Sequence, residues 1–184
     1  MKVVFMEYKK ISVTGTPGTG KTVVSKLLAE RLGYRLIKVN DVVKKKSVET
    51  TKDEKRDTVS VDTESLKKVL SNIVEDNTVL EGHLSHYFCS EIVVVLRCSP
   101  DGLESRLSKR NWSREKISEN VESEAVGVIL SEAVELCEKV VEVDTTGKSV
   151  DQVVDVLEKI VSGKVSTQKF EPGSVDWSSF LGKM

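Results

Sequence analysis

Residues 15–22 of this chain have the types and spacing that bind a polyphosphate. They read Gly-Thr-Pro-Gly-Thr-Gly-Lys-Thr and match the pattern G-x-x-x-x-G-K-[ST]. Glycines let the backbone curl so that successive N–H groups point at phosphate oxygens, and a helix that follows presents its positive end there. The pattern therefore predicts a nucleotide-binding loop, built by Gly15, Gly18, Gly20, Lys21 and Thr22.

Four side chains in two segments are candidates for the chemistry at such a loop. Lys21 can bridge phosphate oxygens, and the Thr22 hydroxyl is suited to ligate Mg²⁺. Glu81 lies where a Walker B acid would hold Mg²⁺ through water, with a buried and satisfied carboxylate as the alternative. His83 is a candidate for orienting a water or a substrate hydroxyl, with an ordinary core or surface histidine as the alternative.

Two arginines are candidates for neutralising charge on a transferred phosphoryl group. Transfer requires positioning and charge neutralisation, and arginines on a closing segment supply both. Arg106 and Arg110 follow the predicted fourth strand at a spacing of four, where a lid would carry them. The alternative is a solvated helix face paired with Glu104.

The elements that must position these residues alternate along the chain. Strand-like runs and helical patterns follow one another five times, which predicts an α/β fold with a five-stranded parallel sheet and helices on both faces. The strands are expected at 10–14, 34–39, 78–81, 91–96 and 140–143, and the helices at 22–32, 66–74, 117–136 and 149–161. Because ligands bind at the carboxyl ends of such strands, Glu81 and His83 are expected beside the phosphate loop.

Capping residues predict where three of the helices begin. Ser99 with Pro100 fits the start of a helix, Ser113 reads as a fresh cap, and Ser149 with Gln152 forms a capping box. In the 117–136 helix, the residues expected to face inward are Val121, Ala125, Val128 and Ile129.

Two segments lack periodicity. Residues 42–61 are expected to form a mobile insertion rather than a sheet element, either a substrate-binding flap or a solvated charged loop. The tail at 164–184 contains Phe170, Trp177 and Phe180, so we expect it to pack on the body or on a partner; a frayed tail is the alternative.

Composition and charge indicate the number of domains and the kinds of partner to expect. A chain of 184 residues with a net charge of −1 fits one domain and gives no reason to expect a polyanion as the main partner. No apolar run approaches about 18 residues, so a soluble, cytoplasmic protein without membrane contact is expected.

The cysteines and histidines match no metal-binding frame. Cys89, Cys98 and Cys137 are odd in number and widely spaced, which predicts reduced core thiols. A zinc site from His83, His86 and Cys89 would lack a paired C-x-x-C or H-E-x-x-H pattern.

Three segments together resemble the atypical adenylate kinase family, small enzymes with a short lid that are tied to maturation of the small ribosomal subunit. The segments are the phosphate loop, Glu81-Gly82-His83, and a stretch that reads RLSKRNWS at 106–113 and KISENVESE at 116–124. The resemblance covers about residues 9–162 and is to an archaeal-type member of these nuclear, CINAP-like kinases. It implies a P-loop NTPase fold of the nucleoside monophosphate kinase type.

The resemblance also implies a division of the chain and roles for its residues. One kinase domain would span 1–163, with an AMP-binding insertion near 38–61 and a lid near 109–119, followed by the tail. The residues implied to hold the ATP phosphates are Gly18, Gly20, Lys21, Thr22 and Val23. Arg110 would be the lid arginine, Lys148 would lie in the loop behind the adenine, and Asp41 would open the AMP-binding segment.

The chain departs from the family pattern at two places. Eukaryotic members have Asp-x-His where this chain has Glu81-Gly82-His83, which changes the magnesium geometry. Their insertion carries an arginine soon after the aspartate, whereas this chain has Lys44 and Lys45, and lysine lacks the bidentate fork of arginine.

Three functions follow from these observations. The first is reversible phosphoryl transfer from MgATP to AMP. The second is slow ATP hydrolysis that drives release from a small-subunit ribosomal protein or pre-ribosomal RNA, and the third is a kinase of the same fold with another acceptor. A GTPase is not favoured, because the chain lacks the guanine-reading Asn-Lys-x-Asp motif. The chain also lacks a basic stripe interleaved with aromatics, which argues against stable, sequence-specific nucleic-acid binding.

Overall fold

A computed structural model describes residues 8–45, 48, 50–53 and 58–181 of the chain. Its main sheet has five strands in the order β2-β5-β1-β6-β7, and every neighbouring pair is parallel. The strands are β1 (Lys10–Thr14), β2 (Arg35–Lys38), β5 (Thr78–Glu81), β6 (Ile92–Arg97) and β7 (Val140–Asp144). The predicted five-stranded parallel sheet is confirmed.

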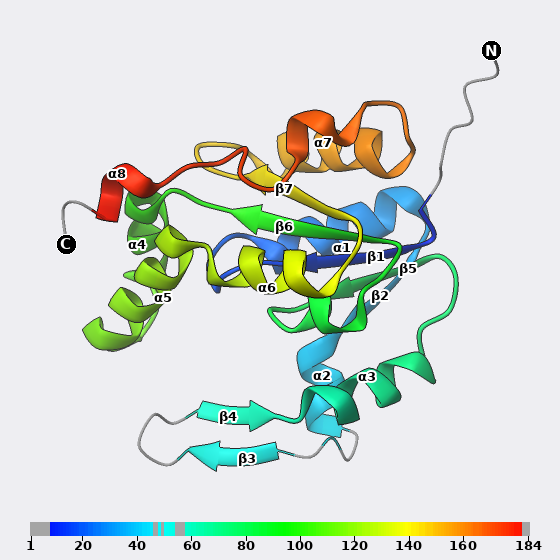
Figure 1. Ribbon diagram of the computed structural model, residues 1–184, viewed down its shortest axis with the longest axis horizontal. Coiled ribbons are helices and arrows are strands. Elements are labelled where there is room, and N and C mark those ends of the chain that lie inside the picture. The colour runs from blue at the N-terminus through cyan, green and yellow to red at the C-terminus, as the bar shows by residue number, and fades with distance from the viewer. Residues whose placement is uncertain (1–7, 46–47, 49, 54–57, 182–184) are drawn as a thin grey trace.

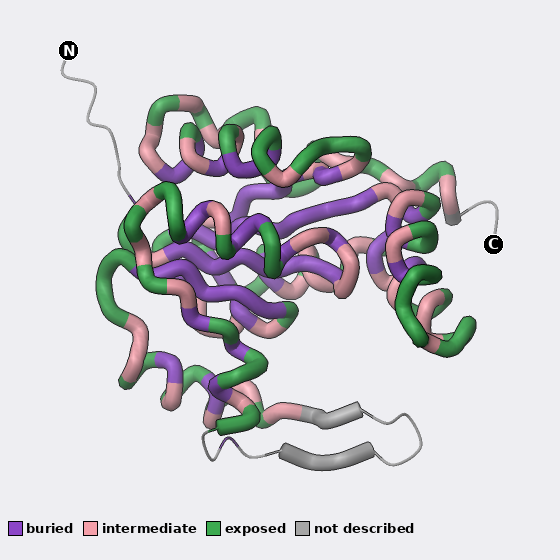
Figure 2. The backbone as a smooth tube through the Cα atoms, turned by 180° about the vertical axis from the view of Figure 1, so that it is seen from behind, coloured by how far each residue is buried: buried purple, intermediate pink, exposed green. Residues whose placement is uncertain are grey.

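Helices cover both faces of this sheet, because alternate apolar residues of its strands point to opposite sides (Figures 1 and 2). On β6, Val94 and Leu96 pack with α1 and α7, whereas Val93 and Val95 pack with α6. The helices that pack on the sheet are α1 (Lys21–Leu32), α3 (Thr63–Ser71), α6 (Val128–Leu136) and α7 (Val150–Val161). Every residue of β5 and β6 is buried, which explains their continuous apolar runs.

Side-chain caps start the helices where the sequence placed them. The Ser99 hydroxyl accepts from the Gly102 N–H at the start of α4 (Pro100–Leu107). The Ser113 hydroxyl accepts from the Lys116 N–H at the start of α5 (Arg114–Val126). Ser149 and Gln152 form the predicted capping box of α7. These caps confirm the predicted break between Arg110 and the following helix.

The prediction of a single helix over residues 117–136 is wrong. Two helices, α5 and α6, meet at Gly127, which has a φ of 72° and caps the end of α5 with a left-handed backbone. Because an α-helix cannot continue through that conformation, the chain changes direction there. Val121 and Ala125 are buried and Ile129 is half-buried, but Val128 is 40% exposed rather than inward-facing.

The prediction that residues 42–61 contain no sheet element is also wrong for the part of this segment that the structure describes. Helix α2 (Val39–Lys45) follows directly on β2. Strand β3 (Thr50–Asp53) pairs antiparallel with β4 (Thr58–Val61). The two strands form a sheet of their own apart from the main sheet (Figure 1). The hydrogen bonds that join the two strands come from the backbone, so they require no alternation of apolar residues. The apolar pattern of the sequence therefore did not predict these strands. Residues 46–47, 49 and 54–57 of the insertion lie outside the described residues.

The expectation of three reduced thiols is corrected for two of them. Cys89 and Cys137 form a disulfide, with Cα atoms 5.2 Å apart, between the end of η1 (Ser85–Phe88) and the end of α6. They are 48 residues apart in sequence, so only the packing of α6 beside η1 brings them together. Cys98 is a free and buried thiol, as predicted.

The tail returns across the body of the protein (Figure 1). It contains η2 (Thr167–Phe170) and α8 (Ser178–Leu181). Phe170 packs on the core cluster that includes the buried residues of α7, and Phe180 packs against Leu103, Leu107 and Val121 of α4 and α5. The tail therefore packs on the body, as its aromatic residues suggested.

Candidate functional site

An open cavity of about 1400 Å³ lies at the carboxyl ends of the strands. Its walls come from the phosphate loop, α2, the end of β5, and the segment from Arg110 into α5. Parallel strands direct their carboxyl ends to one edge of the sheet, which brings these distant segments together. The predicted site residues that line it are Gly18, Gly20, Lys21, Thr22, Val23, Glu81, His83 and Arg110.

The phosphate loop has the curled backbone that its glycines predict. Gly15, Gly18 and Gly20 have φ values of 135°, 99° and 101°, a region that favours glycine. A β-carbon on Gly18 would lie 2.7 Å from the Leu103 side chain, so this glycine also permits close packing of α4. Helix α1 begins at Lys21 and directs its positive end into the cavity.

Lys21 is buried and rests on the loop itself. Its Nζ donates to the Gly15 carbonyl at 2.7 Å and to the Thr16 carbonyl at 3.0 Å. Burial lowers the pKa of Lys21 to about 8, an effect that the nearby charges of Glu81 and Glu124 oppose. The ammonium group is thus held in a partly desolvated position, where a phosphate oxygen would be a favourable new partner.

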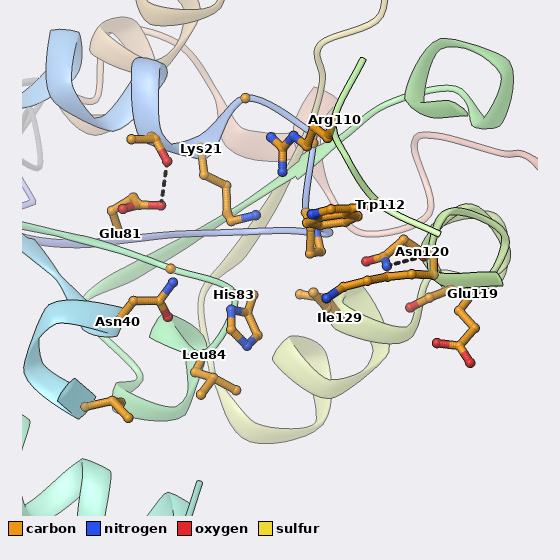
Figure 3. Close-up of a pocket in the computed structure, with 18 of the residues that line it drawn as sticks. Lys21, Asn40, Glu81, His83, Leu84, Arg110, Trp112, Glu119, Asn120 and Ile129 are labelled. Atoms are coloured by element: carbon orange, nitrogen blue, oxygen red, sulfur yellow. Dashed lines mark hydrogen bonds between the residues drawn. The ribbon is translucent and has the colours of Figure 1, made fainter. Parts of the chain in front are cut away.

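Thr22 and Glu81 meet at the edge of the cavity. The Thr22 hydroxyl donates to the Glu81 carboxylate at 3.1 Å (Figure 3). Glu81 is the last residue of β5 and is buried, whereas Thr22 is exposed in the first turn of α1. A hydroxyl and a carboxylate oxygen side by side are ligands that Mg²⁺ accepts, so the pair fits a magnesium ion beside the phosphate loop.

His83 lies two residues beyond β5, and its side chain faces the space that Lys21 and Arg110 also face (Figure 3). His83 is exposed to solvent, but the surrounding cavity walls partly desolvate its ring and lower its pKa, and the charge of Lys21 lowers that pKa further. Its imidazole is therefore neutral near pH 7 and can accept a hydrogen bond.

Arg110 and Lys116 both contact Trp112. The Arg110 guanidinium carbon lies 5.1 Å from the centre of the indole ring, and the Lys116 Nζ lies 4.9 Å from it. Both distances suit cation–π attraction. Because Arg110 is exposed, it is free to exchange this contact for a phosphate group.

The other predicted site residues lie outside the cavity walls. Arg106 donates to the Gly18 carbonyl at 3.4 Å and to the Thr145 carbonyl at 3.0 Å, so it braces the back of the loop. Lys148 donates to the Asp144 carbonyl at 2.7 Å, and the Gly15 carbonyl accepts from Lys21. Asp41 lies in α2 next to Asn40, and Asn40 is the residue that lines the cavity.

Sequence reasoning missed about half of the cavity wall. From the segment after Arg110 and from α5 it lacked roles for Trp112, Ser113, Glu115, Lys116, Glu119, Asn120 and Ser123, although most of these lie in the segments that carry the family resemblance. From α2 and its surroundings it lacked Asn40, Val43, Val61 and Leu84, for which no local motif exists. The spacing of Lys116, Asn120 and Ser123 along one helical face was the available signal.

Residues 11–127 match the model of a protein family described as an AAA domain. The chain belongs to this family. It is also similar to archaeal proteins named "Putative adenylate kinase". The protein from Methanosarcina mazei is 42% identical, with 91% of this chain and 96% of that protein covered. The protein from Thermococcus gammatolerans is 47% identical, with 91% and 92% covered. The Methanocaldococcus jannaschii protein is 39% identical, with 92% and 93% covered.

Solved structures with the same fold are P-loop kinases of lower sequence identity. Shikimate kinase from Acinetobacter baumannii, in complex with shikimate, has a TM-score of 0.55 and 18% identity, covering 86% of this chain and 96% of that chain. Deoxyadenosine kinase from M. mycoides, with bound dATP, has a TM-score of 0.54 and 17% identity, covering 84% and 99%. These structures establish the fold of this AAA domain chain as that of the P-loop kinases.

Proposed function

We propose that this protein is an adenylate kinase, which transfers a phosphoryl group reversibly from MgATP to AMP and produces two ADP. The observation that carries the proposal is one continuous cavity that extends from the phosphate loop to helix α2. Its volume of about 1400 Å³ exceeds the ~300–1,000 Å³ of a pocket for a single small ligand. Two nucleotides can therefore meet in it with their phosphates facing each other.

The donor half of the cavity contains the phosphate loop. Backbone N–H groups of Gly18 and Gly20, together with those at the start of α1, would hold the ATP phosphates. Lys21 would leave the carbonyl groups of the loop and bind phosphate oxygens. Val23 lines the same wall and is 52% exposed.

The acceptor half lies against α2 and the end of β4. Its wall contains the Asn40 amide and the Lys44 ammonium beside the apolar side chains of Val43, Val61 and Leu84. This combination suits a nucleoside monophosphate, because a base packs on apolar surface while an ammonium pairs with phosphate. The names of the relatives support AMP as the preferred acceptor. Asp41, as the opening residue of this segment, would act by positioning α2.

Thr22 and Glu81 would hold Mg²⁺, Thr22 through its hydroxyl and Glu81 directly or through water. The bound ion would offset negative charge on the phosphates. Each of these residues then supplies an oxygen atom at the edge of the loop where the ATP phosphates would lie.

In the proposed transfer, an oxygen of the AMP phosphate attacks the γ-phosphorus of ATP, and the bond from that phosphorus to the β-phosphate oxygen breaks. Both products are ADP. Lys21 and Arg110 would neutralise the charge on the transferred group, since both face the space between the donor and acceptor halves (Figure 3). Arg106 would assist through the Gly18 carbonyl, and Lys148 through the loop that follows β7.

Incubation with MgATP labelled on the γ-phosphate tests this function, provided that labelled ADP is separated from inorganic phosphate. We expect label to appear in ADP in step with AMP consumption, at about 1–100 s⁻¹. Lys21→Ala is the control and should abolish transfer. Release of labelled inorganic phosphate at a rate indifferent to AMP would contradict the kinase.

Slow ATP hydrolysis is a second candidate activity, and the position of His83 favours it. The neutral imidazole lies on the cavity wall beside Lys21, where it can orient a water toward the γ-phosphate. We expect His83→Ala to reduce AMP-independent phosphate release more than AMP-dependent transfer. A role in maturation of the small ribosomal subunit, with a ribosomal protein or pre-ribosomal partner, stays a prediction from the family resemblance.

A further inference from the structure

A buried network of ion pairs and hydrogen bonds connects the phosphate loop with helix α5. Glu124, on α5, is 2% exposed, and Arg97, at the end of β6, is 3% exposed. One Glu124 carboxylate oxygen accepts from the Arg97 Nε at 2.7 Å and from the Cys98 N–H at 3.0 Å. The other accepts from the Thr16 hydroxyl at 2.5 Å. The carboxylate therefore uses one oxygen to attach to the sheet and the other to attach to the phosphate loop.

Thr16 is the centre of the hydrogen bonds within the loop. Its carbonyl accepts from the Lys21 Nζ at 3.0 Å, from the Thr19 hydroxyl at 2.9 Å and from the Thr19 N–H at 3.2 Å. A shift of Thr16 would thus move the acceptor of Lys21 and the turn that precedes α1. The hydroxyl that anchors Thr16 donates to Glu124 across 108 residues of sequence.

The same helix also forms part of the cavity wall. Lys116, Asn120 and Ser123 line the cavity from α5, and Glu124 follows them on the side turned toward the loop. Glu124 is thus attached to both the wall and the loop, so any movement of α5 toward a bound nucleotide is transmitted to Thr16.

The negative charge of Glu124 is compensated on the side away from the loop. Arg97 also donates from Nη2 to the Glu124 carbonyl at 2.8 Å and pairs through Nη1 with Glu142 of β7. The second Glu142 oxygen accepts from the N–H groups of Gly173 and Val175 in the tail, at 2.9 and 3.1 Å. Glu124 and Glu142 thus share the single positive charge of Arg97, and the N–H groups of the tail satisfy the second Glu142 oxygen on the side away from the phosphate loop.

We propose that Glu124 is a positioning residue for ATP: through the Thr16 hydroxyl it fixes the phosphate loop, and with it Lys21, to helix α5. This inference rests on the proposed function in that the loop binds the ATP phosphates. It assigns Glu124 no contact with the nucleotide.

The test compares four variants in the full chain by two measurements. The variants are Glu124→Gln, Thr16→Val, the two combined, and Thr16→Ser, with Glu122→Gln as the control on the exposed side of the same helix. The measurements are the Kd for MgATP by titration with a fluorescent ATP analogue and the KM for AMP in the transfer assay. A glutamine amide can accept from Thr16 or satisfy Arg97 and Cys98, but it replaces one acceptor oxygen by a donor.

We expect Glu124→Gln and Thr16→Val each to raise the Kd for MgATP about tenfold, as expected for loss of a hydrogen bond to a charged group. The combined variant should bind no more weakly than the weaker of the two single variants, because both remove the same contact. Thr16→Ser and Glu122→Gln should bind like the unchanged protein, and the KM for AMP should be preserved throughout.

Unchanged binding by Thr16→Val would overturn the proposal, as would effects of the two changes that multiply. If Glu124→Gln does not fold, the pair Thr16→Val and Thr16→Ser decides the question, because they differ in the hydroxyl at this position. A protein that binds MgATP but transfers nothing to AMP would refute the proposed function and still leave this comparison of Kd values decisive.

Discussion

Among single residues, Lys21 is buried and would supply the positive charge that pairs with a bound phosphate. Its lowered pKa results mainly from burial, and Glu81 and Glu124 limit the shift. Arg106, in contrast, does not face the cavity. Its spacing from Arg110 suggested a shared catalytic face, yet Arg106 donates to backbone carbonyls behind the loop while Arg110 faces the cavity. Spacing along a segment cannot reveal that α4 ends between them.

The pH dependence of ATP affinity follows from Lys21. In the free protein its pKa is about 8, and a bound polyphosphate favours the ammonium form and raises that pKa. Affinity should therefore be constant below about pH 8 and fall as the pH rises above it, with a proton taken up on binding. Isothermal titration in buffers of different ionisation enthalpy measures this proton.

Lys21→Met is the control for that titration. It should bind MgATP weakly at every pH and show no proton uptake between pH 8 and 10. Proton uptake of the same size in this variant would assign the titration to another group.

Arg110→Ala should lower kcat by about 10²–10³, the range for removal of one group that stabilises developing charge. Arg110 is exposed, so the free energy of unfolding should change little. Lys109→Ala, at an exposed neighbour, is the matched control and should retain kcat. A normal kcat for Arg110→Ala in steady-state transfer would remove Arg110 from the proposed mechanism.

At the scale of elements, the junction between α5 and α6 determines which side chains face the cavity. The apolar spacing from Val121 to Ile129 continues smoothly, so periodicity predicted one helix. Gly127 instead takes a left-handed backbone. A glycine inside a helical pattern is tolerated often enough that sequence alone does not decide between a break and a continuous helix.

Gly127→Ala tests this junction. A β-carbon there would meet Arg97 atoms at 3.8 Å, an ordinary contact, so the cost comes from the left-handed backbone. We expect a loss of about 1–2 kcal/mol in the free energy of unfolding, measured with urea. Ser131→Ala, at an exposed position of α6, should change it by less than about 0.5 kcal/mol. An equal effect of both changes would mean that the junction carries no strain for alanine.

Across the whole molecule, the sequence predicted the order of the main-sheet strands along the chain but not the contacts between distant elements. The phosphate loop, the sheet and the capping serines each have a local pattern, and all were confirmed. The network of Arg97, Glu124 and Glu142 and the Cys89–Cys137 disulfide join residues 27 to 48 positions apart. Such contacts depend on packing, which has no signature in a single sequence.

The tail offers a test at this scale. Ending the chain after Phe170 removes three groups that donate to buried Glu142, from Gly173, Ser174 and Val175, and it removes Phe180 from α4 and α5. We expect the free energy of unfolding to fall by at least about 2 kcal/mol, because one oxygen of the buried carboxylate loses its donors while the other keeps its pairing with Arg97. Phe180→Ala alone should have a smaller effect. An unchanged Tm of the shortened chain would show that the tail contributes no stability.

The central claim is that one cavity binds the donor and the acceptor nucleotide at the same time. Calorimetric titration with two adenosines joined by five phosphates tests it most directly, because this probe spans both halves. We predict one probe per chain, bound at least about a hundredfold more tightly than ATP, since linking the halves makes the second contact intramolecular. AMP and ATP should each compete with it. Binding no tighter than that of ATP, with AMP binding unaffected, would contradict the claim.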